Sequence, residues 1–353
     1  MAIQNGDLFR GRHPFDGLGK HKGVEMQGED WFYRLTGLAS DDFASVQQGI
    51  VLEAGNHLYS LVNQRRLQAG YLSLPALADM SKPSGMVRVR LQELVADVQD
   101  LHAHPDNAEA VFQVASQFNL LEMIGPHVRP EDGIAGYVYD QTQGPACAMA
   151  CAAGTLYRNY FVKLGEQTGQ SEAIQLNTLA DLEAALGNAE RGLWEMVNGY
   201  LLPYANGLQQ VTGLIRGREA ELRALIRVGM QADTEVTLPN CGHTVTQVYA
   251  SAVPMAYASA GERGWEALAR LVLEAAYELT LLIAAQSPKK RVFLTRLGGG
   301  AFGNPDAWID DAIVRAIEQV QGADLEVFLV SHLHSHAHNQ MLINRCRELG
   351  LVE

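Results

Sequence analysis

The fold that this sequence predicts is decided by the stretch RVFLTRLGGGAFGNPDAWIDDAIVRAIEQV, residues 291–320. An apolar strand over 292–297 runs directly into a segment rich in glycine. Asn304, Pro305 and Asp306 then begin a helix whose apolar residues recur at helical spacing. Glycines let the backbone turn its amides outward, and the helix N-terminus favours an anion, so the segment predicts a phosphate-binding loop. The loop consists of Gly298, Gly299, Gly300, Ala301, Phe302, Gly303 and Asn304.

A glycine-rich tight turn is the alternative interpretation of this segment. A Walker loop is excluded because no Gly-Lys-Ser or Gly-Lys-Thr follows. The dinucleotide pattern GxGxxG fits Gly298, Gly300 and Gly303, but no acidic residue ends the next strand at the distance that this pattern requires. Phe302 is the aromatic residue within the loop, where it either packs on a nucleotide or fills the core.

Outside this stretch, apolar and β-branched runs alternate with helical periods, which predicts an α/β fold with a mainly parallel or mixed sheet. The predicted strands cover residues 86–94, 110–118, 244–251, 291–297 and 325–331. Residues 41–68 show the three- and four-residue spacing of an amphipathic helical region. A linker rich in Pro, Ser and Gly lies near Ser81. We therefore predict an N-terminal arm and helical lobe over 1–81, and an α/β domain over 82–353 with a helical insertion at about 178–230.

Three further segments follow one another in a fixed order along the chain. A strand in VRVRLQELVADVQDL leads to Asp97, a strand in AVFQVASQFN ends at Asn119, and VTQVYASAVPMAY precedes a helix over 265–285. Together with the glycine loop, this order resembles the macrodomain superfamily of ADP-ribose binders and hydrolases. The resemblance implies a macrodomain-like mixed sheet flanked by helices. It also implies that Asp97 accepts a hydrogen bond from the adenine amino group, that Asn119 faces the distal ribose and that the glycine loop binds the diphosphate.

The sequence departs from that family between Asn119 and Phe161, where it reads NLLEMIGPHVRPEDGIAGYVYDQTQGPACAMACAAGTLYRNYF. This long stretch carries Asp132 and Asp140 before a helix rich in small residues. It is similar to a divergent branch that includes bacterial effectors removing ADP-ribose from arginine of ubiquitin, in which acidic residues of this loop perform the chemistry. The resemblance implies that Asp132 and Asp140 are catalytic. The alternative is that Asp132 belongs to a Pro-Glu-Asp-Gly turn and that Asp140 caps the following helix.

Two carboxylates suit the hydrolysis of an ADP-ribosyl glycosidic bond, because the reaction passes through an oxocarbenium-like centre at the ribose. We therefore predict an ADP-ribosylhydrolase that acts on an N- or O-glycosidic bond of a modified protein side chain. Its expected partners are ADP-ribose and an ADP-ribosylated protein, with arginine and ubiquitin as the specific candidates. The scheme requires no metal and no organic cofactor. The alternative function is a non-catalytic reader module that binds ADP-ribose without cleaving it.

A second chemical signal lies at residues 331–339, SHLHSHAHN, where histidine occupies every second position. In an extended segment, His332 and His336 would share one face, as a metal site with two histidine ligands requires. Cys241 and His243 would complete such a site only if the fold brought them near. A solvated surface segment is the alternative interpretation, and no CxxC or HExxH spacing supports the metal site.

Composition excludes several other classes of protein. The chain has 353 residues, of which 47% are hydrophobic and 19% are charged, as in a globular protein with a large core. Its net charge of −13 argues against a surface that binds nucleic acid. Four cysteines without a CxxC pair indicate a reducing compartment, and charged residues interrupt the longest apolar run, which argues against a membrane span. No cleavable signal peptide is visible, so we predict a cytoplasmic protein. A delivered effector is the alternative that this observation leaves open.

Overall fold

The computed structural model describes residues 31–85, 87–257 and 264–353, so the N-terminal arm expected from the sequence lies outside the described residues. The α-helices are α1 (Trp31–Thr36), α2 (Phe43–Gly49), α3 (Val98–Ala103), α4 (Gln143–Ala150), α5 (Ala152–Leu156), α6 (Ala180–Leu186), α7 (Asn188–Arg191), α8 (Ala205–Ile215), α9 (Glu219–Ala224), α10 (Glu266–Gln286), α11 (Asp306–Gln319) and α12 (Ala337–Glu348). The strands are β1 (Ile50–Glu53), β2 (His57–Ser60), β3 (Arg66–Gln68), β4 (Tyr71–Ser73), β5 (Arg90–Val95), β6 (Val111–Ala115), β7 (Lys163–Leu164), β8 (Gln167–Thr168), β9 (Trp194–Val197), β10 (Tyr200–Pro203), β11 (Gly229–Glu235), β12 (Thr244–Ala250), β13 (Arg291–Leu294) and β14 (Glu326–Ser331). The short 3₁₀ or π turns are η1 (Leu77–Asp79), η2 (Pro105–Asn107), η3 (Pro130–Asp132), η4 (Ala135–Tyr139), η5 (Tyr157–Phe161) and η6 (Met255–Tyr257).

A seven-stranded mixed sheet forms the centre of the molecule, in the order β4-β11-β12-β6-β13-β14-β5. The strands from β12 to β5 run parallel, whereas at the other edge β11 pairs antiparallel with β12 and β4 pairs antiparallel with β11. Each of the five predicted strands is present with shorter bounds, and the predicted α/β class with a mixed sheet flanked by helices is confirmed. β11 and β4 are not predicted from the sequence, because polar Gln231, Asp233 and Glu235 interrupt the apolar pattern of β11.

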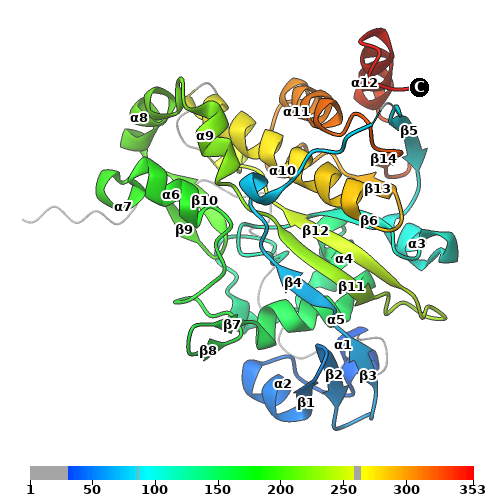
Figure 1. The fold of residues 1–353 in the computed structure, drawn as a ribbon. Coiled ribbons are helices and arrows are strands. Elements are labelled where there is room, and N and C mark those ends of the chain that lie inside the picture. Colours follow the sequence, from blue (N-terminus) through cyan, green and yellow to red (C-terminus); the bar gives the residue numbers. More distant parts are fainter. Residues whose placement is uncertain (1–30, 86, 258–263) are drawn as a thin grey trace, which may run out of the picture.

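Helices cover both faces of this sheet, and alternate residues of the central strands belong to different layers of the core (Figure 1). In β12, Val248 and Ala250 pack in the cluster that includes α10 and α11, while Tyr249 packs on the other face with Cys147 of α4. α10 is buried on nearly all sides, because α8, α9 and α11 pack against it. Among the residues that the structure describes, no helix is both long and apolar enough to cross a membrane.

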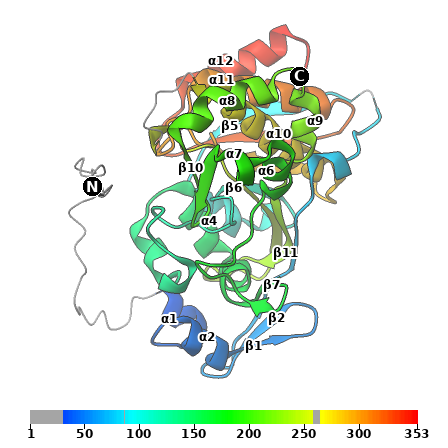
Figure 2. The same ribbon diagram turned by 90° about the vertical axis from the view of Figure 1, so that its left-hand side faces the viewer.

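The N-terminal unit is mainly a small antiparallel sheet, so the prediction of a helical region over 41–68 is wrong. Only α2 is helical in this range, and β1, β2 and β3 follow it. Gly55 and Asn56 lie in the left-handed region at the turn between β1 and β2, and this turn ends the helical period suggested by the apolar spacing. The chain already joins the main sheet at Tyr71, before the boundary expected near Ser81. The small sheet lies at one end of the molecule (Figure 2).

The insertion at about 178–230 is helical only in part. It contains α6, α7, α8 and α9, but a hairpin of β9 and β10 separates them into two pairs. Asn198 and Gly199 form the hairpin turn, with φ of 47° and 79°. An Asn-Gly pair between two extended segments favours this turn, so the wholly helical prediction for the insertion is wrong.

Candidate active site

A pocket of about 260 Å³ opens at the carboxyl ends of β6, β12 and β13, in the middle of the main sheet. Ligands of open α/β sheets bind at this edge, because the loops that follow neighbouring parallel strands meet there. The walls of the pocket come from these loops, from the start of α4 and from the first residue of β10.

The predicted glycine loop forms one wall of the pocket. The residues of the loop that line it are Gly298, Gly300, Ala301 and Phe302. Within the described part of the chain, the backbone amides of these four residues donate no hydrogen bond. Gly298 has a φ of 72°, and a Cβ atom there would lie 2.5 Å from the Cβ atom of Ala252. The loop therefore presents unpaired amides beside an open space, and this arrangement suits a phosphate group.

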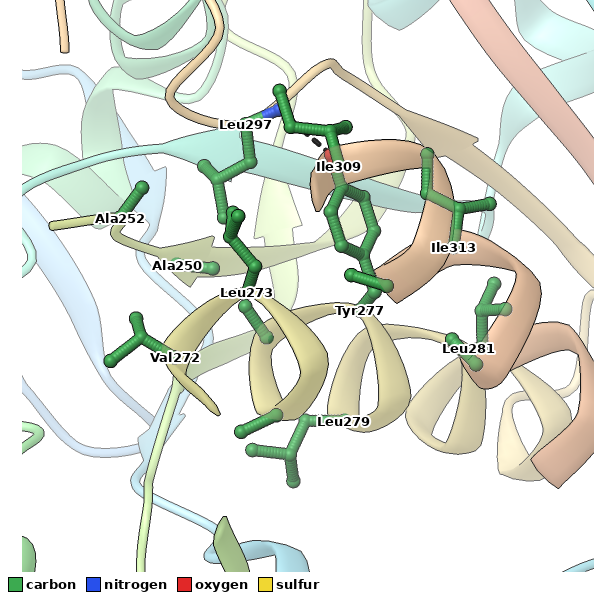
Figure 3. Packing of buried hydrophobic residues seen from close by; sticks show 14 of the residues in the cluster. Ala250, Ala252, Val272, Leu273, Tyr277, Leu279, Leu281, Leu297, Ile309 and Ile313 are labelled. Atoms are coloured by element: carbon green, nitrogen blue, oxygen red, sulfur yellow. Dashed lines mark hydrogen bonds between the residues drawn. The ribbon is translucent and has the colours of Figure 1, made fainter. Parts of the chain in front are cut away.

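Uncharged groups of the core hold the glycine loop in place. The Tyr277 hydroxyl accepts a hydrogen bond of 2.8 Å from the Leu297 amide and donates one of 2.7 Å to the Thr295 carbonyl oxygen. Figure 3 shows the Tyr277 ring rising from α10 among apolar side chains to meet the Leu297 amide. The buried Asn304 side chain closes the loop by donating to the Gly298 carbonyl oxygen at 3.2 Å. These hydrogen bonds link the loop conformation to the core.

Three members of the predicted loop do not line the pocket: Gly299, Gly303 and Asn304. Gly303 has a φ of 68° and supplies the second left-handed turn of the loop. A Cβ atom at Gly299 would lie 3.1 Å from the side chain of Ile309, so this glycine allows the loop to approach α11. These residues shape the loop, and their predicted contact with a ligand stays a prediction.

The N-terminus of α4 forms a second wall. Thr142, Gln143 and Pro145 line the pocket, and no acidic residue occupies the first turn of this helix. The Gln143 side chain ties the turn to β6, since it accepts a hydrogen bond of 2.9 Å from the Ala115 amide and donates one of 2.8 Å to the Gln113 carbonyl oxygen. The positive end of the helix dipole therefore lies at the pocket and favours an anion.

Three aromatic rings from separate segments gather at the pocket. Tyr200 comes from β10, Tyr257 from η6 and Phe302 from the glycine loop. The ring centroid of Tyr200 lies 5.8 Å from that of Tyr257 and 5.6 Å from that of Phe302. Phe302 lines the pocket and also packs against the main core, and its packing on a nucleotide stays a prediction. The rings form an aromatic wall that can pack against a base or a ribose.

Asp140 is the predicted catalytic residue that reaches the pocket. Its carboxylate accepts a hydrogen bond of 2.9 Å from the Thr142 amide, which holds it at the start of α4. Burial raises the pKa of Tyr200 and of Tyr257, and the negative charge of Asp140 adds to both shifts, so the carboxylate lies near the aromatic wall. One cavity therefore contains a carboxylate, aromatic rings and unpaired amides.

Asp132 does not join Asp140 among the residues that line the pocket, so the predicted pair of catalytic carboxylates is not assembled. Asp132 lies in η3, where its carboxylate is 2.8 Å from the Arg129 guanidinium and accepts a hydrogen bond of 2.8 Å from the Arg129 amide. The hydrogen bond from Arg129 lowers the pKa of Asp132. The structure thus shows the Pro-Glu-Asp-Gly turn, which was the alternative interpretation.

Asn119 is fully buried and contacts protein groups, and its expected contact with a ribose stays a prediction. Its side chain accepts a hydrogen bond of 3.1 Å from the Leu121 amide and donates one of 2.8 Å to Gln175. The hairpin turn covers it, since a Cβ atom at Gly199 would lie 2.4 Å from Asn119 Oδ1. The β9–β10 hairpin, which the sequence reading did not include, therefore occupies the space beside Asn119.

Asp97 lies at the same edge of the sheet but outside the lining of the pocket. It is half exposed, caps α3 by accepting a hydrogen bond of 2.7 Å from the Gln99 amide, and lies 3.8 Å from His332. β5, which precedes Asp97, is separated from β13 by β14. The contact of Asp97 with adenine stays a prediction.

A carboxylate of β5 organises the histidine segment. The groups that donate to Glu93 are the side chains of Ser331, Ser335, Asn339 and Gln340 and the amide of His336. Burial alone would raise the pKa of Glu93, but hydrogen bonds lower it to about 2. Cys241 and His243 contact backbone carbonyl oxygens. Among the described residues, no three His, Cys, Asp or Glu side chains form a group that could hold a metal ion.

Several residues that line the pocket are not predicted as site residues from the sequence, among them Glu122, Tyr200, Tyr257 and Arg296. Arg296 brings a cation, but Asp306 and Asp310 each lie 2.7 Å from its guanidinium and neutralise it. Tyr200 directly follows the Asn-Gly turn, so recognition of the hairpin would have indicated it. Glu122 follows a short apolar run and carries no local signal of its position.

No protein-family model matches this sequence, and no curated protein matches it either. The chain is similar to the solved structure of poly(ADP-ribose) glycohydrolase from Thermomonospora curvata, with 12% identity over 85% of this chain and 94% of that chain and a TM-score of 0.42. It is also similar to poly(ADP-ribose) glycohydrolase from Deinococcus radiodurans in complex with ADP-ribose, with 11% identity over 79% of this chain and 94% of that chain and a TM-score of 0.41. These values describe a distant likeness of fold.

Proposed function

We propose that the protein is an ADP-ribosylhydrolase that releases ADP-ribose from a modified protein side chain. The supporting observation is that three features meet in one pocket: unpaired loop amides, an aromatic wall and the carboxylate of Asp140. An ADP-ribosyl group matches this set, because it combines a diphosphate, a nucleobase and a ribose carbon that carries a glycosidic bond.

In this scheme the diphosphate binds to the glycine loop. The amides of Gly298, Gly300 and Phe302 supply hydrogen-bond donors, and the N-terminus of α4 adds a favourable dipole. Binding through backbone amides agrees with the net charge of −13, which leaves no broad cationic surface for phosphate. Tyr200, Tyr257 and Phe302 then pack against the ribose or the base.

Asp140 acts at the glycosidic bond. Hydrolysis breaks the bond between the ribose anomeric carbon and the side-chain atom, and the oxygen of water bonds to that carbon. The Asp140 carboxylate stabilises the oxocarbenium-like centre and accepts a proton from the water, while the departing side-chain atom gains one proton from solvent. The net reaction consumes one water and yields ADP-ribose and the unmodified side chain. The scheme uses no metal and no organic cofactor.

For the substrate we further propose ADP-ribosylated arginine. The guanidinium of arginine is cationic, so the Asp140 carboxylate attracts it to the position of the scissile bond. Ubiquitin is our candidate for the protein that carries the arginine, on the basis of the resemblance in the stretch between Asn119 and Phe161.

A reader that binds ADP-ribose without hydrolysing it is the second candidate. One observation favours it: of the two expected carboxylates, Asp140 lines the pocket and Asp132 is paired with Arg129 instead. A reader needs the loop amides and the aromatic wall, but it does not need a second carboxylate.

Titration calorimetry with free ADP-ribose tests the pocket, and turnover of a mono-ADP-ribosylated arginine peptide separates the two candidates. For a hydrolase, Asp140→Asn retains ADP-ribose affinity within about threefold, while turnover falls by about 10²- to 10⁴-fold. A wild-type protein that binds ADP-ribose but releases none from the peptide is a reader. Failure of the wild-type protein to bind ADP-ribose contradicts both functions.

A further inference from the structure

Residues 134–144 are called here the Asp140 segment. A buried ion pair between Arg158 and Glu122 lies next to this segment. The side chains of Arg158 and Glu122 are both fully buried, and Arg158 Nη2 lies 3.2 Å from Glu122 Oε1 and 3.3 Å from Oε2. On its other side, Arg158 donates through Nη1 to the Tyr249 hydroxyl, and its guanidinium carbon lies 3.6 Å from the centre of the Tyr249 ring. Arg158 Nε donates to the Leu120 carbonyl oxygen at 2.9 Å, so the guanidinium is held on all sides.

Stability alone is a poor reason for such a pair. Removing two charges from water is costly, and well-packed apolar residues of similar volume often stabilise a fold as well or better. Burial raises the pKa of Glu122 to about 7, although the positive charge of Arg158 acts in the opposite direction. The pair is better explained by the geometry that it imposes on its neighbours.

Glu122 contacts the Asp140 segment on both sides of Asp140. Before Asp140, the buried Tyr137 hydroxyl accepts a hydrogen bond of 2.9 Å from the Glu122 amide, and the Tyr137 carbonyl oxygen accepts one of 3.1 Å from the Asp140 amide. After Asp140, Gly144 lies directly on the Glu122 side chain, since a Cβ atom at Gly144 would lie 3.2 Å from Glu122 Cγ. The segment that carries Asp140 therefore contacts Glu122 on both sides, through the main-chain amide of Glu122 before Asp140 and through the Glu122 side chain after it.

We propose that Glu122, with Arg158 as its counter-ion, is a positioning residue that fixes Asp140 in the pocket. This inference rests on the proposed role of Asp140 in hydrolysis. Glu122 is among the residues that line the pocket, but its carboxylate has no exposed surface, so we assign it to positioning and not to contact with the substrate. Loss of its charge leaves Arg158 buried without a counter-ion, and the surrounding turns must then move to solvate it.

The test compares Glu122→Gln with Glu278→Gln, a matched control in which a buried glutamate of α10 pairs with Arg223 and Arg315 away from the pocket lining. In Glu122→Gln, hydrogen exchange of the amides in residues 134–144 is expected to accelerate by about tenfold or more, while exchange in residues 297–304 stays unchanged. The turnover number is expected to fall by about tenfold or more, while the Kd for ADP-ribose stays within about twofold. Glu278→Gln should leave exchange of both segments and turnover as in the wild type.

Each outcome decides the inference. Equal exchange of residues 134–144 in both variants overturns it, as does a Glu122→Gln protein that loses stability but keeps the wild-type turnover number. If Glu122→Gln does not fold, Tyr137→Phe replaces it, because the Tyr137 hydroxyl accepts from the Glu122 amide and its hydrogen bond to the Glu122 carboxyl group lowers the pKa of that group, so this variant removes the link between Glu122 and the segment before Asp140. A wild-type protein without turnover contradicts the proposed function, and the exchange comparison then still decides whether Glu122 fixes the segment.

Discussion

The glycine loop and the Asp140 segment meet at one pocket but are held by different kinds of group. Neutral groups hold the glycine loop: the Tyr277 hydroxyl and the Asn304 side chain. The Asp140 segment lies on a buried ion pair of Glu122 and Arg158. The comparison suggests a division of roles, in which uncharged groups hold the wall that would bind the diphosphate, and the wall that would perform chemistry depends on a buried charge.

The largest expected effect separates the two aspartates of the acidic stretch. Asp140→Asn should lower turnover of the arginine-linked peptide by about 10²-fold or more, because it removes the carboxylate at the pocket. Asp132→Asn should change turnover by less than about threefold, since Asp132 pairs with Arg129 outside the lining. Steady-state assays of both purified variants measure this difference. Equal losses of turnover in the two variants would support the hypothesis of two catalytic carboxylates and contradict the assignment of catalysis to Asp140 alone.

The next effect concerns the backbone of the glycine loop. Gly298→Ala should weaken ADP-ribose binding by about tenfold or more and cost about 1–2 kcal/mol of stability, because Gly298 has a φ of 72° and its new methyl group would meet Ala252. Gly300→Ala is the matched control, as a Cβ atom there meets no atom within 4 Å. Thermal unfolding and calorimetry measure both quantities. Similar stability losses in the two variants would contradict the described loop geometry.

A smaller effect appears in the pH dependence of stability. Burial raises the pKa of Glu122 from its ordinary 4.5 to about 7, so the folded state retains a proton that the unfolded state has lost in this interval. The free energy of unfolding should therefore decrease by about 1–3 kcal/mol between pH 4.5 and 7 through this group, and then level off. Groups facing Glu122 do not titrate there, because Arg158 stays charged and the pKa values of Tyr137, Tyr249 and Cys147 are raised.

The measurement is the difference between the wild type and Glu122→Gln in chemical denaturation at several pH values. The difference is needed because burial lowers the pKa of His102 to about 4, so that this histidine adds stability as pH rises from 4 to 6.5. The His102 contribution is common to both proteins and cancels. A difference that does not depend on pH would show that Glu122 titrates normally in the folded state.

The smallest expected effect is a loss of stability when the Tyr277 hydroxyl, an uncharged group that holds the glycine loop, is removed. Tyr277→Phe should cost about 1–2 kcal/mol, because the Leu297 amide and the Thr295 carbonyl oxygen both lose their hydrogen bond to the hydroxyl. The loss should not vary with pH between 5 and 8, in contrast to that of Glu122→Gln. Tyr33→Phe, at a half-exposed ring in α1, serves as the control. A pH-dependent loss in Tyr277→Phe would remove the distinction between the two walls.

The sequence predicts the elements that depend on local residue patterns. It does not predict the position of a side chain that is set by contacts with distant segments. The five central strands and the glycine loop are predicted because apolar runs and glycines act on their own neighbourhood. The sequence pattern around Asp132 and around Asp140 is equally compatible with a catalytic role, but Asp132 pairs with Arg129 whereas Asp140 lines the pocket. The surroundings of Asn119 likewise depend on a distant segment, because the hairpin turn at Gly199 covers it.

The β9–β10 hairpin also has a consequence for how the specificity of such a protein can change. In the part of the chain that the structure describes, its two strands pair with each other outside the seven-stranded sheet, and yet the hairpin supplies one of the three rings at the pocket. A longer or shorter hairpin would alter which molecules fit while the glycine loop and Asp140 stay as they are. The hairpin thus behaves as an exchangeable module, and grafting a different one offers a route to redesign ligand choice without rebuilding the sheet.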